Sequence, residues 1–448
     1  MLSGGAAPPG LRVAILLPLS GSNAALGQTM LRAARLALAS PGSPALDVRD
    51  TRGSAEGAAD AARESLSSGD ALILGPLTNT ETAAVAPLAA AAGVAVLAFT
   101  SDAAQARPGV WVLGITAQQQ VDRLVAAARA EGRSRFAAVL PDGAFGQALG
   151  DAFARDTAEG GPDGGPNGGT SGGTSGQIRR ATGFSATSAA LKQVSGYTAR
   201  RGAAQAQHSA AESQRRDAQA AGDATRAGTD PATDPAPAPE PATEPTPPPL
   251  DALLLGTGGT TLRDLPTVLA LYDLKLPSVR LLGPALWAQD ASRLGGLAGA
   301  WYVAPDPALR ARFVQAYAAS AQAGGQAATP AGVLPDLGAA GPADAQAAAV
   351  PGPRPAAASA PPPALADIAY DAAAIARVLA AQGYGPAALQ RPEGFAGTDG
   401  VFALLPGGAV RRDLAVFQID AGGGAHIVAP AVVVPAVAVP AGASPPGA

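Results

Sequence analysis

Short apolar runs alternate with segments of helical periodicity along the first part of the chain. Leu11–Leu17 and Leu72–Leu74 are apolar at almost every position, which is typical of strands buried on both faces of a sheet. Further strands are expected at 46–50, 94–99 and 110–115, and helices at 26–39, at 55–66 and from Asn79 or Thr80 to residue 92. Ser54 is the expected cap of the second helix, and Asn79 or Thr80 is the expected cap of the third. Strands and helices that alternate in this order predict a doubly wound α/β layer.

The stretch 71–102 predicts a strand, a helix and a second strand in close succession. Such a unit is almost always a right-handed crossover, so its strands lie parallel and end at the same edge of the sheet. The first loop at that edge carries Thr78, Asn79 and Thr80, and the second carries Thr100 and Ser101, followed by Asp102. Ligands bind beyond the carboxyl ends of open parallel sheets. These two loops therefore predict a binding cleft.

The same strand–loop–helix order returns after residue 117 and predicts a second α/β lobe. Strands are expected at 136–140, 253–255, 279–282, 301–303, 400–405 and 414–419, and helices at 120–130, 147–158, 262–272, 308–321 and 365–381. Between them, 184–226 is helical but becomes almost wholly polar, so we expect a solvent-exposed helix or helical hairpin.

Several segments lack the apolar residues needed for a core. The region 160–249 is Gly-rich at its start, helical in its middle and Pro-rich at its end, and it is expected to be an insertion in the second lobe. A second insertion, 324–363, and the tail 430–448 are rich in Ala, Gly, Val and Pro and are predicted to be disordered.

Composition narrows the possible functions. The chain has 448 residues, enough for two or three domains, and a formal net charge of -4, which gives no basic field for nucleic acid. It contains no Cys, which excludes disulfides, thiolate metal sites and Cys nucleophiles. No apolar leader precedes Leu11, so the protein is either cytosolic or begins after a leader that is missing from this sequence.

No arrangement of residues points to catalysis, a metal or a cofactor. The two histidines, His208 and His426, lie outside the predicted layers, and no HExxH, GxSxG or P-loop pattern occurs. The Gly256-Thr257-Gly258-Gly259 run resembles a dinucleotide loop imperfectly and is better interpreted as a strand-to-helix turn that faces the cleft.

Some residues after predicted strands allow two interpretations. Asp102, Asp142 and Asp290 could anchor a ligand or act as helix caps and turn residues. Phe145 and Trp287 could line a pocket or fill the core.

A set of motifs in this order resembles a known family. The motifs are LLPLSGSNAALGQTM, LDVRDT, LILGPLTNTETAAVAPLAAAAGVAVLAFTSD, LPDGAFGQAL, AYDA and FAGTDGVF with RRDLAVFQI. They resemble the type I periplasmic ligand-binding proteins of the leucine/isoleucine/valine type. Within that superfamily the chain looks most like the penicillin-binding protein activators of alphaproteobacteria.

The resemblance implies two α/β lobes joined by three hinge crossings. Lobe 1 would comprise 11–116 and 305–397, and lobe 2 would comprise 117–304 and 398–419. The hinges would lie near 115–117, 303–305 and 397–399.

The resemblance also implies ligand-binding positions. In lobe 1 they are Thr78, Asn79 and Thr80 in one loop and Ala98, Phe99, Thr100 and Ser101 in the next. Phe145 matches an aromatic of the second lobe that is usually Tyr, and Tyr370 is the Tyr of AYDA. Thr257 joins these candidates because its strand-to-helix turn is expected to face the cleft.

The sequence departs from this pattern in ways that weaken the hypothesis that the ligand is an amino acid. Leu26 replaces a common aromatic, Phe145 lacks a hydroxyl, and Gly283–Ala285 carries no carboxylate for a ligand ammonium. A buried ammonium without a partner costs several kcal/mol.

The leading hypothesis is a non-enzymatic periplasmic regulator that contacts a penicillin-binding protein through the polar helical segment after Phe184. It could be a membrane-anchored lipoprotein if the true N-terminus lies upstream. The alternative is a substrate-binding protein that delivers amino acids or other small polar solutes to an ABC permease. An enzyme on the same fold is the hypothesis with the least support.

Overall fold

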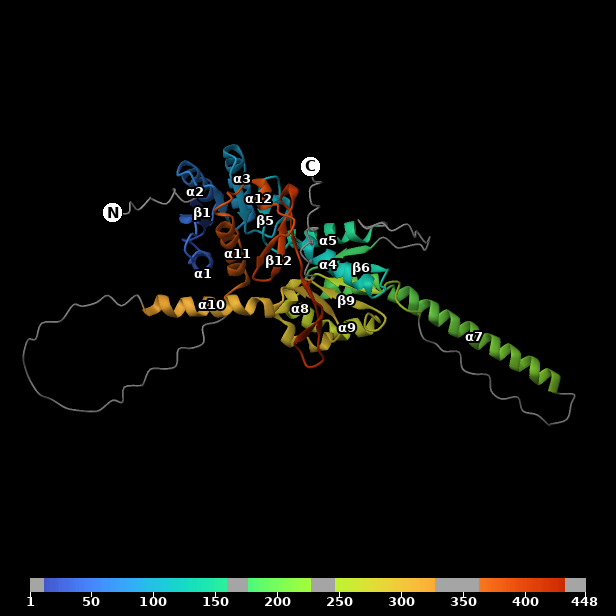
Figure 1. The fold of residues 1–448 in the computed structure, drawn as a ribbon. Coiled ribbons are helices and arrows are strands. Elements are labelled where there is room, and N and C mark those ends of the chain that lie inside the picture. Colours follow the sequence, from blue (N-terminus) through green and yellow to red (C-terminus); the bar gives the residue numbers. More distant parts are fainter. Residues whose placement is uncertain (1–11, 159–175, 227–245, 327–361, 432–448) are drawn as a thin grey trace, which may run out of the picture. The chain divides into compact units, whose positions relative to one another are not determined.

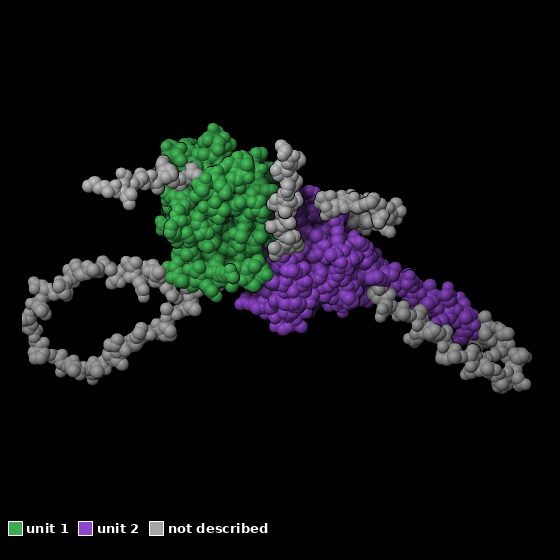
Figure 2. All heavy atoms as spheres, viewed as in Figure 1, with its two compact units in different colours: residues 1–115, 305–413, 433–448 green, residues 116–304, 414–432 purple. Residues whose placement is uncertain are grey.

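The computed structural model describes residues 12–158, 176–226, 246–326 and 362–431. The chain divides into two compact units, which Figure 2 shows in different colours. Unit 1 contains Met1–Ile115 and Pro305–Asp413, and unit 2 contains Thr116–Ala304 and Leu414–Val432. Over the described residues the chain therefore passes between the units three times. Most of the Gly- and Pro-rich segments predicted to be disordered lie outside the described residues.

Unit 1 contains a five-stranded parallel sheet. Its strands are β1 (Arg12–Leu17), β2 (Ala45–Asp50), β3 (Leu72–Leu74), β4 (Ala95–Ala98) and β5 (Val110–Val112). They lie in the order β2-β1-β3-β4-β5, and every neighbouring pair is parallel. The doubly wound α/β layer predicted from the sequence is confirmed.

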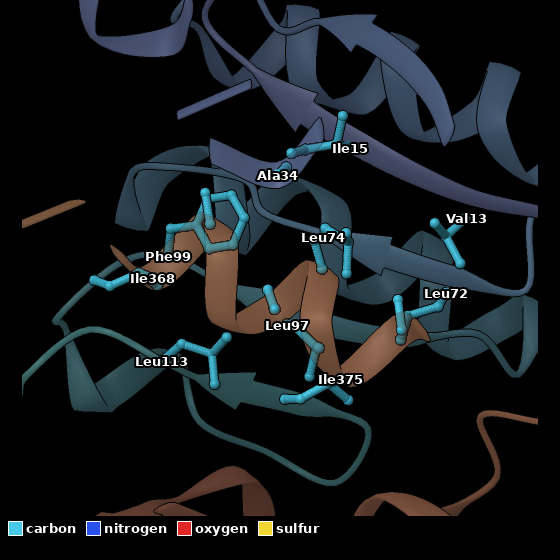
Figure 3. Packing of buried hydrophobic residues seen from close by; sticks show 14 of the residues in the cluster. Val13, Ile15, Ala34, Leu72, Leu74, Leu97, Phe99, Leu113, Ile368 and Ile375 are labelled. Carbon is cyan, nitrogen blue, oxygen red and sulfur yellow. The ribbon is translucent and has the colours of Figure 1, made fainter. Parts of the chain in front are cut away.

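Helices cover both faces of this sheet. Because alternate residues of each strand point to opposite faces, the same strands contribute apolar side chains to the core on either side. Val13, Leu72 and Leu97 join one core cluster with the helices α1 (Ala24–Ala37) and α11 (Ala364–Leu379). Figure 3 shows this cluster.

The other face is covered by α2 (Ala55–Ser67) and α3 (Asn79–Ala92), which pack on Leu16 and Ile73. Full burial of each Leu or Ile contributes about 1.5–3 kcal/mol. Strands buried on both sides explain the nearly continuous apolar runs in the sequence.

Local signals set the ends of α2 and α3. The Ser54 hydroxyl caps α2 by accepting a hydrogen bond from Gly57 N at 3.0 Å, as predicted. Thr78, rather than the predicted Asn79 or Thr80, caps α3, because its hydroxyl and the Glu81 carboxylate form a reciprocal capping box. Gly93 ends α3 in a left-handed conformation.

A small antiparallel sheet completes unit 1. It contains β11 (Phe395–Gly397), β12 (Gly400–Leu404) and β13 (Val410–Arg412), and the helices α10 (Pro307–Gln326) and α12 (Pro386–Leu389) accompany it. The sequence interpretation placed 398–413 in the second lobe. The structure groups these residues with unit 1, because Phe402, Leu404 and Val410 join its core. The helix α10 also continues through 324–326, which were predicted to be disordered.

Unit 2 contains a seven-stranded mixed sheet. Its strands lie in the order β15-β14-β10-β9-β8-β6-β7, and the pairs β10–β14 and β14–β15 are antiparallel. The strands are β6 (Phe136–Leu140), β7 (Gln177–Arg180), β8 (Ala252–Leu255), β9 (Arg280–Gly283), β10 (Trp301–Ala304), β14 (Ala415–Ile419) and β15 (Ala425–Ala429). The helices are α4 (Ala117–Ala130), α5 (Ala144–Thr157), α6 (Phe184–Val194), α7 (Tyr197–Arg226), α8 (Gly259–Asp264) and α9 (Pro266–Leu271).

The two edge strands of this sheet were not predicted. β7 lies inside the region 160–249 that was interpreted as an insertion, but it pairs with β6, and Leu191 of α6 is buried in the unit 2 core. β15 follows the last predicted strand and carries His426. Both strands are partly exposed, as edge strands often are. β7 is mostly polar and β15 has only a short apolar run, 427–429, so neither gives a strong strand signal. Within the described residues, no helix combines the length and apolar character needed to cross a membrane.

Replacement of Gly75 tests the turn after β3. Gly75 has a φ of 91°, and a Cβ there would lie 2.4 Å from the Leu16 carbonyl oxygen. Gly93 also has a positive φ, 68°, but a Cβ there would meet nothing within 4 Å. We expect Gly93→Ala to lower the free energy of unfolding by about 1 kcal/mol and Gly75→Ala by at least about 2 kcal/mol, measured by urea denaturation. Equal losses in the two variants would contradict the close backbone approach.

Candidate functional site

The two loops predicted to converge at the carboxyl edge of the unit 1 sheet do lie together. The Phe99 N–H donates to the Pro76 carbonyl at 2.9 Å. Farther along, Asn79 Nδ2 donates to Asp102 Oδ2 at 3.3 Å. A backbone bond and a side-chain bond thus join the loop after β3 to the loop after β4.

Many polar groups of the first loop form hydrogen bonds within the loop itself. The Thr78 hydroxyl donates to Glu81 Oε2 at 2.7 Å within the capping box, while Asn79 and Thr80 are exposed. In the second loop, Asp102 Oδ1 accepts a hydrogen bond from Ala104 N at 3.0 Å and so caps a short helical turn. These contacts hold the loops in place.

A cavity of about 380 Å³ lies within unit 1 beside the loop after β4. It is lined by apolar side chains, two hydroxyls and a pair of opposite charges, from Leu77, Phe99, Thr100, Ser101, Gly114, Ile115, Ala364, Leu365, Ile368, Asp399 and Arg412. We call it the unit 1 cavity. It includes three of the predicted site residues, Phe99, Thr100 and Ser101.

Gly114 keeps the cavity wall close to Thr100. The Gly114 N–H donates to the Thr100 carbonyl at 3.1 Å. A Cβ at position 114 would lie 2.4 Å from that same oxygen, so only glycine allows this approach. Thr100 is 7% exposed, and its hydroxyl accepts a hydrogen bond from Asp102 N at 3.1 Å.

Five predicted positions of unit 1 do not line the cavity: Thr78, Asn79 and Thr80 in the first loop, Ala98 and Tyr370. Ala98 is fully buried, and its carbonyl accepts a hydrogen bond from Leu113 N at 2.8 Å. Tyr370 lies on α11 and packs its ring 4.9 Å from that of Phe313, measured between centroids.

The corresponding edge of the unit 2 sheet is largely apolar. Phe145, near the start of α5, is 42% exposed, and Leu286, after β9, is 41% exposed. Trp287 fills the core, and its Nε1 donates to the Thr257 carbonyl at 2.8 Å. The Thr257 carbonyl therefore already accepts a hydrogen bond from within unit 2.

The aspartates of this edge serve local contacts. Asp142 Oδ2 accepts a hydrogen bond from the Thr182 hydroxyl at 2.8 Å, which joins the loops after β6 and β7. Asp290 ends a short helical turn by donating from its backbone to Trp287 O at 3.1 Å.

His208 and Glu212 form an exposed pair on α7, 3.1 Å apart. Among the described residues, no group of three or more side chains could hold a metal ion.

A buried cluster of charges lies next to the unit 1 cavity. The Arg310 guanidinium, from α10, bonds to both oxygens of Asp367. Arg412 Nη1, from β13, lies 3.6 Å from Asp371 Oδ2 and 3.5 Å from Asp399 Oδ2. We call these five residues the charge cluster.

Further contacts fix the cluster in place. Thr398 donates from its backbone N–H to Asp371 Oδ1 at 2.8 Å and from its hydroxyl to Asp371 Oδ2 at 3.3 Å. The Arg412 guanidinium lies 4.7 Å from the centroid of the Phe402 ring. The cluster therefore connects α11 to β12 and β13.

Burial changes the acid–base behaviour of this cluster. Desolvation raises the pKa of Asp371 to about 7, although the Arg412 charge opposes the shift. Desolvation likewise raises the pKa of Asp367 to about 6 and raises the pKa of Asp399. Two arginines face three aspartates, so burial and mutual repulsion favour a shared proton.

Sequence reasoning missed the charge cluster, although the sequence contains a signal for it. Asp367 and Asp371 lie four residues apart on the apolar face of the predicted helix 365–381. Two acids on a buried face need cationic or hydrogen-bonding partners. Asp399 and Arg412 lie within the quoted motifs FAGTDGVF and RRDLAVFQI, where they were treated as part of the resemblance.

Comparison with known proteins agrees with this architecture. Residues 10–176 match the model of a periplasmic binding protein family. No curated protein sequence matches the chain significantly.

Solved structures extend the likeness to nearly the whole chain. A putative branched-chain amino acid ABC transporter protein from Rhodospirillum rubrum superposes with a TM-score of 0.60 at 16% identity, covering 94% of this chain and 100% of that one. Full-length LpoA from Haemophilus influenzae gives a TM-score of 0.56 at 16% identity, covering 93% of this chain. This chain spans only 58% of that LpoA chain.

The C-domain of LpoA, described as a regulator of PBP1A, gives a TM-score of 0.55 at 15% identity and is covered to 99%. The solved structures confirm the fold class that the resemblance implied, and the family match over residues 10–176 agrees with the periplasmic binding protein motifs found there.

The raised pKa of Asp371 predicts a pH-dependent contribution to stability. Between its ordinary pKa of 3.8 and about 7, the folded chain binds more protons at Asp371 than the unfolded chain does. This contribution is therefore complete below the lower value and is lost as the pH rises toward the higher one. Asp371→Asn removes it, so the free energy of unfolding of the wild type relative to the variant should decrease over that interval. Urea denaturation across the pH range measures this difference.

Asp217→Asn serves as the control, because Asp217 is exposed on α7. This variant should keep the pH dependence of the wild type. A difference between wild type and Asp371→Asn that does not change with pH would contradict the prediction.

Proposed function

Because the chain has the fold of the type I periplasmic binding proteins, we propose that it is a non-enzymatic, binding protein-like regulator that contacts a penicillin-binding protein in peptidoglycan synthesis. The observation that carries this proposal is α7, a single continuous helix of 30 residues (Figure 1). From Arg201 to Ala220 nearly every residue of it is exposed.

The start of α7 is firmly attached to unit 2. Arg200 Nη2 donates to the Tyr272 carbonyl at 3.0 Å, and Arg200 Nη1 lies 3.1 Å from Asp273 Oδ2. The rings of Tyr197 and Tyr272 meet edge to face, with centroids 5.0 Å apart. A rigid base thus supports an exposed helix, which is a suitable geometry for contact with a partner protein.

The polar character of α7 favours contact with a partner over a role in the core. A helix that is polar all round gains little from packing within its own chain. His208, Glu212 and Arg216 follow each other at i, i+4 spacing, an arrangement that stabilises an exposed helix.

The relatives support this proposal by analogy of fold. The LpoA C-domain has the same architecture and is described as a regulator of PBP1A. At 15% identity the likeness concerns the fold, so the partner of this chain is inferred. A periplasmic location, with or without a lipid anchor, belongs to the same proposal.

The second candidate is a substrate-binding protein for an ABC transporter. The unit 1 cavity favours it, because Thr100 and Ser101 are among the residues lining it. An amino acid or another small polar solute would be the ligand, and an ABC permease would be the partner.

Removal of the exposed part of α7 tests the leading proposal. We expect deletion of residues 203–226 to abolish capture of a penicillin-binding protein in a pull-down from periplasmic extract. The deletion begins after Arg200, so the contacts with Tyr272 remain and the urea unfolding midpoint should not change.

A variant of equal length provides the matched control. Replacement of residues 203–226 by a Gly/Ser sequence keeps the chain length but removes the helix, and it should also lose capture. Retained capture in both variants would reject α7 as the contact surface.

A screen of free amino acids tests the second candidate. A ligand that binds only the folded chain stabilises it by about 2.7 kcal/mol at a hundredfold excess over Kd, so a true ligand should raise the melting temperature by several degrees. Replacing both Thr100 and Ser101 with Ala should remove that shift. The absence of any shift with correctly folded protein would argue against transport.

A further inference from the structure

A second pocket of unit 1, with a volume of about 330 Å³, lies on α1. The described residues that line it all belong to this helix: Gln28, Thr29, Leu31, Arg32 and Arg35. We call it the α1 pocket. Gln28, Arg32 and Arg35 are exposed and follow each other at i, i+4 and i+7 spacing, so they share one face of the helix. Leu31 is 3% exposed and belongs to the core, so the accessible lining is polar.

The helix α10 holds the Arg32 side chain in place. The guanidinium carbon of Arg32 lies 4.2 Å from the centroid of the Tyr317 ring, and its Nη2 donates to the Tyr317 hydroxyl. That hydroxyl donates in turn to the Thr29 carbonyl at 3.2 Å. Tyr317 is 4% exposed, so its position is fixed by packing.

The remaining nitrogens of Arg32 are available to a ligand. Its Nε and Nη1 have no hydrogen-bond partner among the described residues. Because the guanidinium is already held against Tyr317, it loses little conformational freedom when a ligand binds.

Arg35 adds a second positive charge without a counter-ion. Within the described part of the chain, no hydrogen bond or ion pair joins its guanidinium to another residue. The sequence contains no Asp or Glu before Asp47, so α1 has no acid, and α10 has none either. The two acids of α11 belong to the buried charge cluster. The carboxyl end of α1 supplies only about half a negative charge, so the two arginines keep a net positive charge.

This charge favours a phosphate over other ionic groups. A cation would be repelled, and a single carboxylate would neutralise only one of the two arginines. A phosphate monoester carries a charge of about −1.5 to −2 at neutral pH and has three strong acceptor oxygens. Guanidinium groups bind such oxygens in bidentate pairs.

The rest of the α1 pocket suits a small polar body. Its volume exceeds that of a phosphate group alone, so an organic part fits beside it. The Gln28 amide offers both donors and an acceptor. The Thr29 hydroxyl donates to the Ala25 carbonyl at 2.9 Å and so keeps its acceptor capacity for a ligand.

We propose that the α1 pocket binds a phosphate monoester with a small polar organic part. Arg32 and Arg35 bind the phosphate oxygens, and Gln28 and Thr29 contact the organic part. A soluble phosphate ester and the headgroup of phosphatidic acid present this same group, and the experiments below distinguish the two sources. The inference goes beyond the proposed contact of α7 with a penicillin-binding protein, and deletion of residues 203–226 should leave phosphate binding unchanged.

Three ligands that share a glycerol-like body test the proposal on the full chain by isothermal titration calorimetry: glycerol 3-phosphate, glycerate and glycerol. At an ionic strength of about 0.15 M, exposed charges are screened beyond about 8 Å, which suppresses non-specific attraction. We expect glycerol 3-phosphate to bind at least about tenfold more tightly than glycerate, and glycerol to give no heat of binding. If glycerol 3-phosphate gives no heat, or if glycerate binds equally well, the phosphate assignment is wrong.

Two variants locate the site. Arg35→Gln removes one of the two charges from an exposed position, so it should fold normally and weaken glycerol 3-phosphate binding at least about tenfold. Arg312→Gln is the matched control, because Arg312 is an exposed arginine of α10 that does not line the α1 pocket. This control should bind as the wild type does. Unchanged affinity in Arg35→Gln, or an equal loss in Arg312→Gln, would overturn the site.

Flotation with phosphatidylcholine vesicles, with and without phosphatidic acid, identifies the source of the phosphate. If the chain floats only with phosphatidic acid and free glycerol 3-phosphate releases it, the lipid headgroup is the ligand. If the chain does not float, or if glycerol 3-phosphate does not release it, the α1 pocket binds a soluble phosphate ester and the lipid is excluded as its ligand.

Discussion

Unit 1 depends on the charge cluster that joins its late segments to one another. Arg310 from α10 and Arg412 from β13 meet the carboxylates of α11 and of the turn before β12, where every partner except Arg310 is buried. Removal of one partner from a buried ion pair leaves the other uncompensated, which is far more costly than loss of a surface pair. The cluster therefore fixes how the segment after residue 305 returns to the sheet built by the first hundred residues.

The architecture of unit 1 was largely predictable, because its strands are buried on both faces. Continuous apolar runs such as Leu72–Leu74 and the cap at Ser54 are local signals, and the structure has the strand and the helix where they predict them. β7 and β15 were missed for the opposite reason. They are partly exposed edge strands without a long apolar run, so their identity comes from pairing with β6 and β14 rather than from their own sequence.

The candidate site was predictable only in part. The convergence of the loops at Asn79 and Asp102 follows from the handedness of a crossover connection, which the sequence pattern reveals. The contribution of Asp399 and Arg412 depends on how β12 and β13 fold back onto α11. That arrangement depends on contacts between segments that lie apart in the sequence, which no local pattern reveals. The sequence interpretation instead placed those residues in the other lobe.

The packing of α1 against α11 has a consequence for synthesis of the protein. One face of the first sheet is covered by both helices, yet roughly 250 residues separate the end of β5 at Val112 from the start of α11 at Ala364. At a translation rate of about 5–20 residues per second, the ribosome needs about 10–50 seconds to make that stretch. During this interval the nascent chain exposes apolar strand residues such as Leu72 and Leu97. Chaperone protection of the growing polypeptide would therefore be needed for far longer than the folding of a contiguous domain requires.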